Sequence, residues 1–174
     1  MSTPNDLRAA VRDVIDFPKP GIVFKDITPI LADPTLFHES ISLLCATAGK
    51  VKIDKVVGID ARGFIFAAAV ADRLGAGFVP VRKTGKLPWK TRRASYALEY
   101  GEATVELHED AVQPGESILL VDDLLATGGT AAAAVKLLAE LGANLVGISF
   151  LIELSFLHGR SKLIPHPVHS ILSY

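Results

Sequence analysis

The segment ILLVDDLLATGGT, residues 118–130, combines features that favour opposite kinds of ligand. Four apolar residues indicate a strand buried on both faces, and they lead directly into Asp122 and Asp123. The two glycines of Thr-Gly-Gly-Thr let the backbone approach a ligand closely, and the N–H groups that begin the following helix attract an anion. Two carboxylates beside an anion site are costly unless the ligand compensates for them.

A phosphorylated sugar resolves this conflict. Backbone N–H groups would hold its phosphate, while the two carboxylates would accept hydrogen bonds from vicinal ribose hydroxyls. The same acids would stabilise positive charge that develops on the ribose ring as a leaving group departs from C1. A plainer alternative is that Thr130 caps a helix and the glycines only form a turn. The segment therefore favours a ribose 5-phosphate unit over a phosphate alone.

Two other phosphate-binding motifs are absent from the sequence. Neither GxxxxGK[ST] nor GxGxxG occurs, which disfavours a P-loop nucleotidase and a dinucleotide-binding Rossmann domain. The five histidines show no metal-binding spacing, so we assign them no metal.

Short apolar stretches alternate with helical ones on both sides of this segment. The expected strands are KVVGID (55–60), GFVPV (77–81), SILLV (117–121) and LVGISFLI (145–152). Helices are expected over residues 63–75 and about 130–141. Continuously apolar strands alternating with helices predict an α/β fold with an open, mainly parallel sheet flanked by helices.

The N-terminal region has a different pattern. Leu7, Val11, Val14 and Ile15 share one face of an expected first helix. Prolines and a glycine rule out a long helix in residues 16–31, and Asp33-Pro34 is typical of the start of another helix.

A basic segment and an alternating segment interrupt the strand–helix order. RKTGKLPWKTRRA (82–94) carries six of the eighteen basic residues and no acid, and we expect a long mobile loop. A solvated charge run or a nucleic-acid patch is the alternative, but its single aromatic residue argues against binding of single strands. SYALEYGEATVELHED (95–110) alternates on both sides of Gly101-Glu102, which predicts an antiparallel hairpin outside the sheet.

Composition indicates a cytoplasmic protein with one domain. The chain has 174 residues, a net charge of −1 and 49% hydrophobic residues, without an apolar run that could span a membrane or serve as a signal peptide. The single cysteine excludes an internal disulfide. Cys45 lies in an apolar run, so we expect a core thiol rather than a nucleophile.

The motifs together resemble a known family. Residues 118–130 match the phosphoribosyl pyrophosphate (PRPP) signature of type I phosphoribosyltransferases. DFPKPGIVFKDITPIL (16–31), GIDARGF (58–64), VRKTGKLP (81–88) and SYALEYG (95–101), in that order, resemble the adenine-specific members. The resemblance implies magnesium-dependent transfer of ribose 5-phosphate from PRPP to N9 of adenine, giving AMP and pyrophosphate in purine salvage. It also implies a homodimer and a single domain with an N-terminal hood (about 1–34), a flexible lid loop (about 82–95) and a hairpin (about 95–109).

The resemblance also implies roles for individual residues. Those assigned to PRPP and AMP are Asp122 and Asp123 at the ribose, with Ala126, Thr127, Gly128, Gly129 and Thr130 at the 5-phosphate. Those assigned to pyrophosphate are Asp60, Ala61, Arg62, Arg82, Lys83 and Lys86, some of them acting on a neighbouring subunit. Those assigned to adenine are Val23, Phe24 and Lys25 in the hood, with Leu154 packing on the base. Glu99 would assist proton handling on adenine, and the family often has a non-proline cis bond within the Asp60–Ala61–Arg62 segment. Magnesium would be held mainly by substrate and water, with no direct protein ligand.

Plainer interpretations of two residues stay open at the level of sequence. Arg62 could form a surface ion pair, although a strand-end arginine beside an anion site is more typical of a ligand. Glu99 could simply lie on the polar face of a hairpin strand, since Leu98 and Tyr100 alternate with it.

Two other functions compete with adenine transfer. One keeps PRPP and uses guanine, hypoxanthine or orotate, against which the hood and the hairpin both weigh. The other is a PRPP-sensing regulator that binds DNA or RNA. Only about 16 residues precede the first family motif, which are too few for a helix-turn-helix domain.

Overall fold

The computed structural model describes residues 4–97 and 101–174, and the chain divides into two compact units, Met1–Leu43 and Leu44–Tyr174. The described elements of the first unit are α1 (Pro4–Ala10), β1 (Arg12–Ile15), β2 (Val23–Asp26) and α2 (Thr28–Ala32). Helix α3 (Pro34–Ala46) begins in the first unit and ends in the second.

The first unit contains a two-stranded antiparallel sheet, β1–β2, where the sequence predicted the end of a helix. Val14 pairs with Phe24 and Ile15 pairs with Val23. The prediction of one helix through Ile15 was therefore wrong, because β-branched residues pair well with a strand that the local periodicity does not reveal. The predicted start of the next helix is confirmed, since Asp33 Oδ1 accepts the N–H groups of the first turn of α3.

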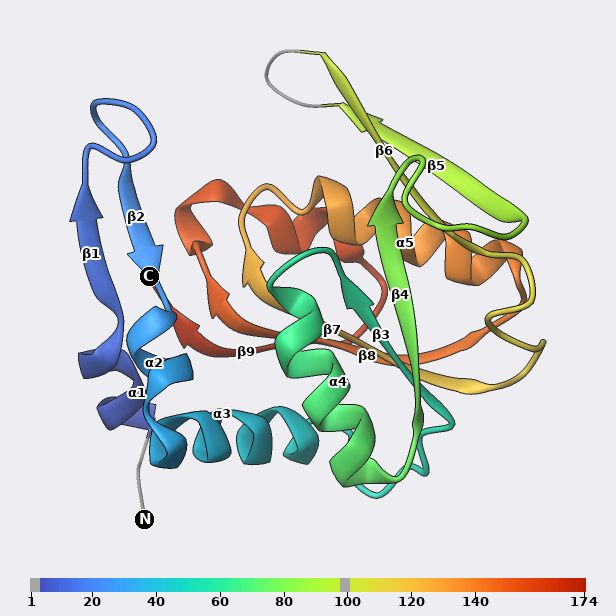
Figure 1. Ribbon diagram of the computed structural model, residues 1–174, viewed down its shortest axis with the longest axis horizontal. Coiled ribbons are helices and arrows are strands. Elements are labelled where there is room, and N and C mark those ends of the chain that lie inside the picture. The colour runs from blue at the N-terminus through green and yellow to red at the C-terminus, as the bar shows by residue number, and fades with distance from the viewer. Residues whose placement is uncertain (1–3, 98–100) are drawn as a thin grey trace. The chain divides into compact units, whose positions relative to one another are not determined.

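The second unit is built on a seven-stranded sheet with the order β5-β6-β4-β3-β7-β8-β9 (Figure 1). The strands are β3 (Lys55–Ile59), β4 (Gly77–Lys83), β5 (Thr91–Ala97), β6 (Glu102–His108), β7 (Ser117–Leu125), β8 (Asn144–Glu153) and β9 (Val168–Ser173). Strands β4, β3, β7, β8 and β9 are parallel, while β6 runs antiparallel to β4 and β5. The predicted open, mainly parallel sheet is therefore confirmed.

Two helices cover opposite faces of the sheet. Alternate residues of a strand face opposite ways, so Val57 and Ile59 of β3 join the core that includes α5 (Gly129–Glu140). Gly58 between them faces Phe64 and Ala67 of α4 (Gly63–Leu74). Two 3₁₀ helices, η1 (Ser155–Leu157) and η2 (Gly159–Leu163), connect β8 to β9. None of the described helices is long and apolar enough to cross a membrane.

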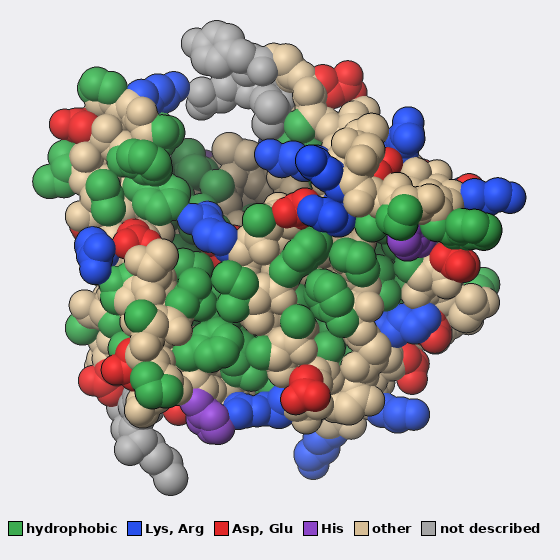
Figure 2. All heavy atoms as spheres, viewed as in Figure 1, with side chains coloured by type: hydrophobic (Ala, Val, Ile, Leu, Met, Phe, Trp, Pro, Cys, Tyr) green, Lys and Arg blue, Asp and Glu red, His purple; other side chains and the backbone are tan. Residues whose placement is uncertain are grey.

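The hairpin β5–β6 continues the sheet instead of leaving it. Arg82 and Lys83 at the end of β4 pair with Glu106 and Val105 of β6, which corrects the expectation of a separate hairpin. The expected lid, about 82–95, contains the end of β4 and the beginning of β5, so only residues 84–90 connect strands. We call these residues the 84–90 turn. Lys and Arg side chains gather beside this hairpin in Figure 2.

Candidate functional site

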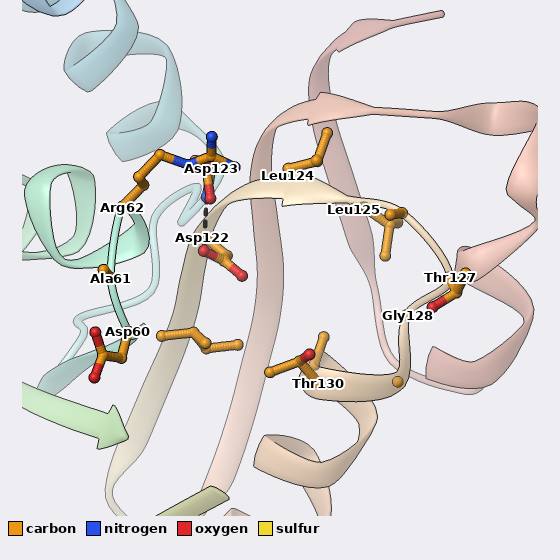
Figure 3. Close-up of a pocket in the computed structure, with 14 residues that line it drawn as sticks. Asp60, Ala61, Arg62, Asp122, Asp123, Leu124, Leu125, Thr127, Gly128 and Thr130 are labelled. Atoms are coloured by element: carbon orange, nitrogen blue, oxygen red, sulfur yellow. Dashed lines mark hydrogen bonds and ion pairs between the residues drawn. The ribbon is translucent and has the colours of Figure 1, made fainter. Parts of the chain in front are cut away.

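A cavity of about 270 Å³ lies at the carboxyl ends of β3 and β7. It is lined by residues 59–62, from the last residue of β3 onward, and by residues 122–131, from the end of β7 to the beginning of α5. The predicted site therefore lies where parallel α/β sheets bind their ligands. In Figure 3, the Asp60–Arg62 segment lies on one side of the cavity, and Thr127, Gly128 and Thr130 lie on the other.

Strand β7 carries the acid pair further into the sheet than the sequence predicted. The expected strand ended at Val121, whereas β7 continues to Leu125. Its pairing with β8 includes Asp122, which lies opposite Phe150, and extends to Leu125. Both acids therefore lie on a hydrogen-bonded strand rather than in a loop. Such a position fixes the backbone from which each carboxylate reaches the cavity.

The acids are crowded and partly withdrawn from water. Asp122 Oδ1 accepts the N–H of Asp123 at 2.9 Å, and Asp123 Oδ2 lies 2.7 Å from Nε of Arg62. Burial, together with the negative charge of Asp123, raises the pKa of Asp122 well above its ordinary value. Burial also raises the pKa of Asp123, and the Arg62 guanidinium opposes that rise. The pair is suited to ligands that donate hydrogen bonds or carry positive charge.

Arg62 belongs to the segment that faces the acids. The Asp60–Ala61 peptide bond is cis, as the resemblance implied. The sequence left open whether Arg62 is a surface ion pair or a ligand. Its ion pair with Asp123 lies at the cavity itself, where the guanidinium is within reach of a bound anion.

Gly63 gives Asp122 the room that it occupies. A Cβ atom at Gly63, the first residue of α4, would lie 2.3 Å from Asp122 Oδ1. No real side chain fits at that distance, so a substitution would require Asp122 or the start of α4 to move. Gly63 was not among the residues predicted for the site, although its position directly after Arg62 in GIDARGF was an available signal.

The 126–130 loop turns sharply into α5. Gly128 has φ of +76° and precedes the helix, whose first N–H groups have no acceptor within the helix. A Cβ atom at Gly128 would lie 2.4 Å from the carbonyl oxygen of Gly159. The loop therefore requires glycine for its backbone conformation and for its close approach to η2.

The segment after β8 supports that loop from behind. A Cβ atom at Gly159 would lie 2.2 Å from the carbonyl oxygen of Ala126, so the two backbones pack directly on each other. Arg160 makes a bidentate ion pair with buried Glu153, in which Nε and Nη2 donate to the two carboxylate oxygens. The hydroxyl of Ser170 donates to the same carboxylate. The hydrogen bonds from Arg160, and then from Ser170, outweigh burial and lower the pKa of Glu153. These residues were not predicted from the sequence, because their contacts join separate elements.

The basic residues predicted for pyrophosphate lie at the end of β4 and in the 84–90 turn. Arg82 Nε donates to Asp60 Oδ2 at 3.0 Å, which connects Arg82 to a residue that lines the cavity. Its Nη1 donates to the carbonyl oxygen of Lys86 at 3.3 Å. Lys83 and Lys86 are exposed and do not line the cavity.

The residues predicted for adenine are distributed between the two units. Leu154 follows β8, is half-buried, and donates its N–H to the carbonyl oxygen of Leu125, which lines the cavity. Val23, Phe24 and Lys25 lie on β2 in the first unit. Glu99 lies outside the described residues.

Cys45 is half-buried on α3, and burial raises the pKa of its thiol, which disfavours the reactive thiolate. Within residues 4–97 and 101–174, no group of three or more His, Cys, Asp or Glu side chains could hold a metal ion. Asp122 and Asp123 supply two carboxylates at the cavity, and oxygen is the ligand that magnesium prefers.

Comparisons with known proteins identify the family. A model of the phosphoribosyl transferase domain matches residues 30–165. The adenine phosphoribosyltransferase of Anaeromyxobacter dehalogenans is 59% identical over 168 residues, which are 97% of this chain and 98% of that protein. That of Acidothermus cellulolyticus is also 59% identical, over 94% of this chain and 93% of that protein.

Solved structures show the same relationship. The crystal structure of adenine phosphoribosyltransferase from Thermoanaerobacter pseudethanolicus has a TM-score of 0.96 and 48% identity, and the match covers 99% of this chain and 100% of that one. The Saccharomyces cerevisiae enzyme, complexed with an imino-altritol bisphosphate and adenine, has a TM-score of 0.91 and 43% identity over 97% of each chain. The chain therefore belongs to the phosphoribosyltransferase family and, within it, to the adenine phosphoribosyltransferases.

Proposed function

We propose that the cavity binds PRPP and that the enzyme transfers its ribose 5-phosphate group to N9 of adenine, releasing pyrophosphate and forming AMP. The observation that carries this proposal is the pairing of two crowded carboxylates with a glycine-rich helix start in one cavity. Neither feature alone selects this ligand. A ribose 5-phosphate group offers hydroxyl donors for the acids and a phosphate for the loop. Relatives that are 59% identical to this chain are adenine phosphoribosyltransferases, and so is a solved structure with a TM-score of 0.96, which supports adenine as the base.

The acid pair would act on the ribose. The carboxylates of Asp122 and Asp123 would accept hydrogen bonds from the two ribose hydroxyls, which replaces the water that burial removes. As the bond from C1 to pyrophosphate breaks, positive charge grows on the ring. The fixed negative charge nearby would stabilise that charge without any reorganisation of solvent.

The two sides of the cavity would hold the 5-phosphate and the pyrophosphate group of PRPP. The N–H groups and hydroxyls of Ala126 through Thr130 would bind the 5-phosphate at the start of α5. The Asp60–Ala61 backbone and Arg62 would bind pyrophosphate on the other side. Arg62 would then exchange part of its contact with Asp123 for the leaving group, which couples charge at the two sites. Arg82, Lys83 and Lys86 would add positive charge, and in a homodimer some of them would serve a neighbouring subunit.

The family resemblance assigns the adenine contacts to individual residues. Val23, Phe24 and Lys25 would contact the base largely through backbone atoms, and Leu154 would pack on its face. Glu99 would handle a ring proton as N9 attacks C1. No covalent nucleophile is needed, because adenine itself attacks the sugar.

The donor set fits magnesium that is held mainly by substrate and water. Two carboxylates are too few for a closed protein site, but their oxygens match the preference of a hard cation. When bound, magnesium would neutralise charge on the pyrophosphate leaving group. We further propose that the enzyme acts in the cytoplasm as a homodimer.

The test is a base panel with the purified protein. PRPP and magnesium are mixed separately with adenine, guanine, hypoxanthine and orotate, and nucleotide and pyrophosphate are measured. AMP from adenine, with little product from the other bases, is the expected result. Product only with another base would overturn the adenine assignment and keep the PRPP site. Binding of PRPP without product from any base would favour a PRPP-sensing regulator.

A further inference from the structure

Glu106 is a buried acid that the chemistry above does not use. It lies on β6, its side chain is 1% exposed, and it does not line the cavity. A buried carboxylate is unfavourable unless hydrogen-bond donors surround it. The position of Glu106 is therefore explained only by the groups that it contacts.

One carboxylate binds the middle of the 84–90 turn and the strand that follows it. Glu106 Oε1 accepts the N–H groups of Gly85, Lys86 and Leu87 at 2.9, 3.2 and 3.3 Å. Glu106 Oε2 accepts hydrogen bonds from the Thr91 hydroxyl at 3.3 Å and from Nε of Arg93 at 3.2 Å. Three consecutive N–H groups that converge on one oxygen fix the backbone of a turn. Glu106 thus fixes the middle of the turn between β4 and β5, while Thr84 donates to the carbonyl oxygen of Thr104 at its beginning.

The same turn is connected to the cavity through Arg82. Its guanidinium donates to the carbonyl oxygen of Lys86 in the turn and to the carboxylate of Asp60 at the cavity. Arg82 also lies opposite Glu106 in the pairing of β4 with β6. A change at Glu106 therefore has a continuous route, through Lys86 and Arg82, to Asp60.

We propose that Glu106 is a positioning residue for pyrophosphate: by binding the N–H groups of the 84–90 turn, it holds the Lys86 carbonyl that keeps Arg82 beside Asp60, where Arg82 would meet the leaving group. This inference rests on the proposed function, since it assumes that the basic residues bind pyrophosphate. It adds a residue that touches no substrate and acts only through the turn.

The charge state of Glu106 is consistent with this role. Burial alone would raise its pKa, but the N–H groups of Leu87, Gly85 and Lys86 and the Arg93 guanidinium hold it below its ordinary value. The group is therefore an anion at neutral pH, which strengthens each hydrogen bond that it accepts.

A purely structural role makes a different prediction. If Glu106 only joined β5 and β6, its loss would lower the affinity for every ligand by the same factor, or it would lower only the melting temperature. A positioning role predicts a loss confined to ligands that contain pyrophosphate. AMP lacks pyrophosphate and uses the acid pair and the 126–130 loop, so it serves as the internal reference.

The experiment is calorimetric titration of the full chain with pyrophosphate, PRPP and AMP, each with magnesium. Glu106→Ala removes the anchor, Glu106→Gln keeps one acceptor oxygen without the charge, and Glu102→Gln changes an exposed acid on the same strand as the matched control. We expect Glu106→Ala to lower the affinity for pyrophosphate and for PRPP by about tenfold or more, and the affinity for AMP by less than about twofold. Glu106→Gln should show an intermediate loss, and Glu102→Gln should match the unchanged protein.

Three outcomes separate the possibilities. Unchanged pyrophosphate affinity in Glu106→Ala, or equal loss for AMP, would overturn the positioning role. If the alanine variant does not fold, a Glu106→Gln protein with normal pyrophosphate affinity would overturn it. Failure of the unchanged protein to bind either PRPP or pyrophosphate would instead refute the proposed function.

Discussion

At the scale of single residues, the site depends on where side chains are missing as much as on where they are present. Asp122 occupies space that only a glycine at position 63 leaves open, since a Cβ there would lie 2.3 Å from its Oδ1. The sequence shows both residues but not their contact, because they lie in separate motifs that only the sheet brings together. Sequence patterns reveal turns that need glycine more readily than they reveal such close approaches.

We therefore predict that Gly63→Ala displaces the Asp122 carboxylate. The added methyl group must move either that carboxylate or the start of α4, so PRPP should bind about tenfold or more weakly and turnover should fall. Steady-state kinetics and calorimetry would measure both effects. The control is Gly77→Ala, where the nearest atom is Lys55 Cγ at 3.4 Å, at an ordinary contact distance on a flexible side chain. Equal PRPP affinity in Gly63→Ala and the unchanged protein would contradict this account.

At the scale of elements, the prediction succeeded where a pattern is local and failed where pairing is distant. The four apolar strands and the helices α4 and α5 follow from periodicity and from glycines near their ends. Charged Asp122 is typical of a loop, but pairing with β8 extends β7 past it. Strand β9, at the edge of the sheet, mixes polar and apolar residues and has no continuous apolar run that would have revealed it.

The stability of the β8–η2–β9 region should fall at acidic pH, and this dependence can be tested. The folded-state pKa of Glu153 is depressed by Arg160 and Ser170, so their interaction stabilises the fold above the ordinary glutamate pKa. That stability is lost as pH falls through the lower folded-state pKa. We expect Glu153→Gln to reduce the free energy of unfolding at about pH 7 and to bring the two proteins closer together at about pH 3.

Urea unfolding across that pH range, followed by circular dichroism, would measure the difference. A matched variant is Glu140→Gln, an exposed acid at the end of α5. Its difference from the unchanged protein should stay near zero across the range. A constant difference for Glu153→Gln at every pH would show that its charge contributes nothing.

At the scale of the whole molecule, the sheet order explains why chemistry from distant parts of the sequence meets in one cavity. Adjacent parallel strands β3 and β7 end at the same edge, so the Asp60–Arg62 segment faces the acid pair and the 126–130 loop. That these segments lie at strand ends could be predicted from the sequence, because an apolar run precedes each of them. The sequence could not show that Arg62 pairs with Asp123, that η2 supports the loop, or that Glu106 binds the 84–90 turn, because each contact joins separate elements.

The central claim is that Asp122 and Asp123 bind ribose hydroxyls beside a 5-phosphate site. It is tested most directly by calorimetric titration with AMP and with 2′-deoxy-AMP, which differ by one hydroxyl. Loss of a hydrogen bond to a charged group predicts at least about tenfold weaker binding of the deoxynucleotide. In Asp122→Asn with Asp123→Asn, that preference should largely disappear. Equal affinity of the unchanged protein for the two nucleotides would contradict the assignment of the acid pair.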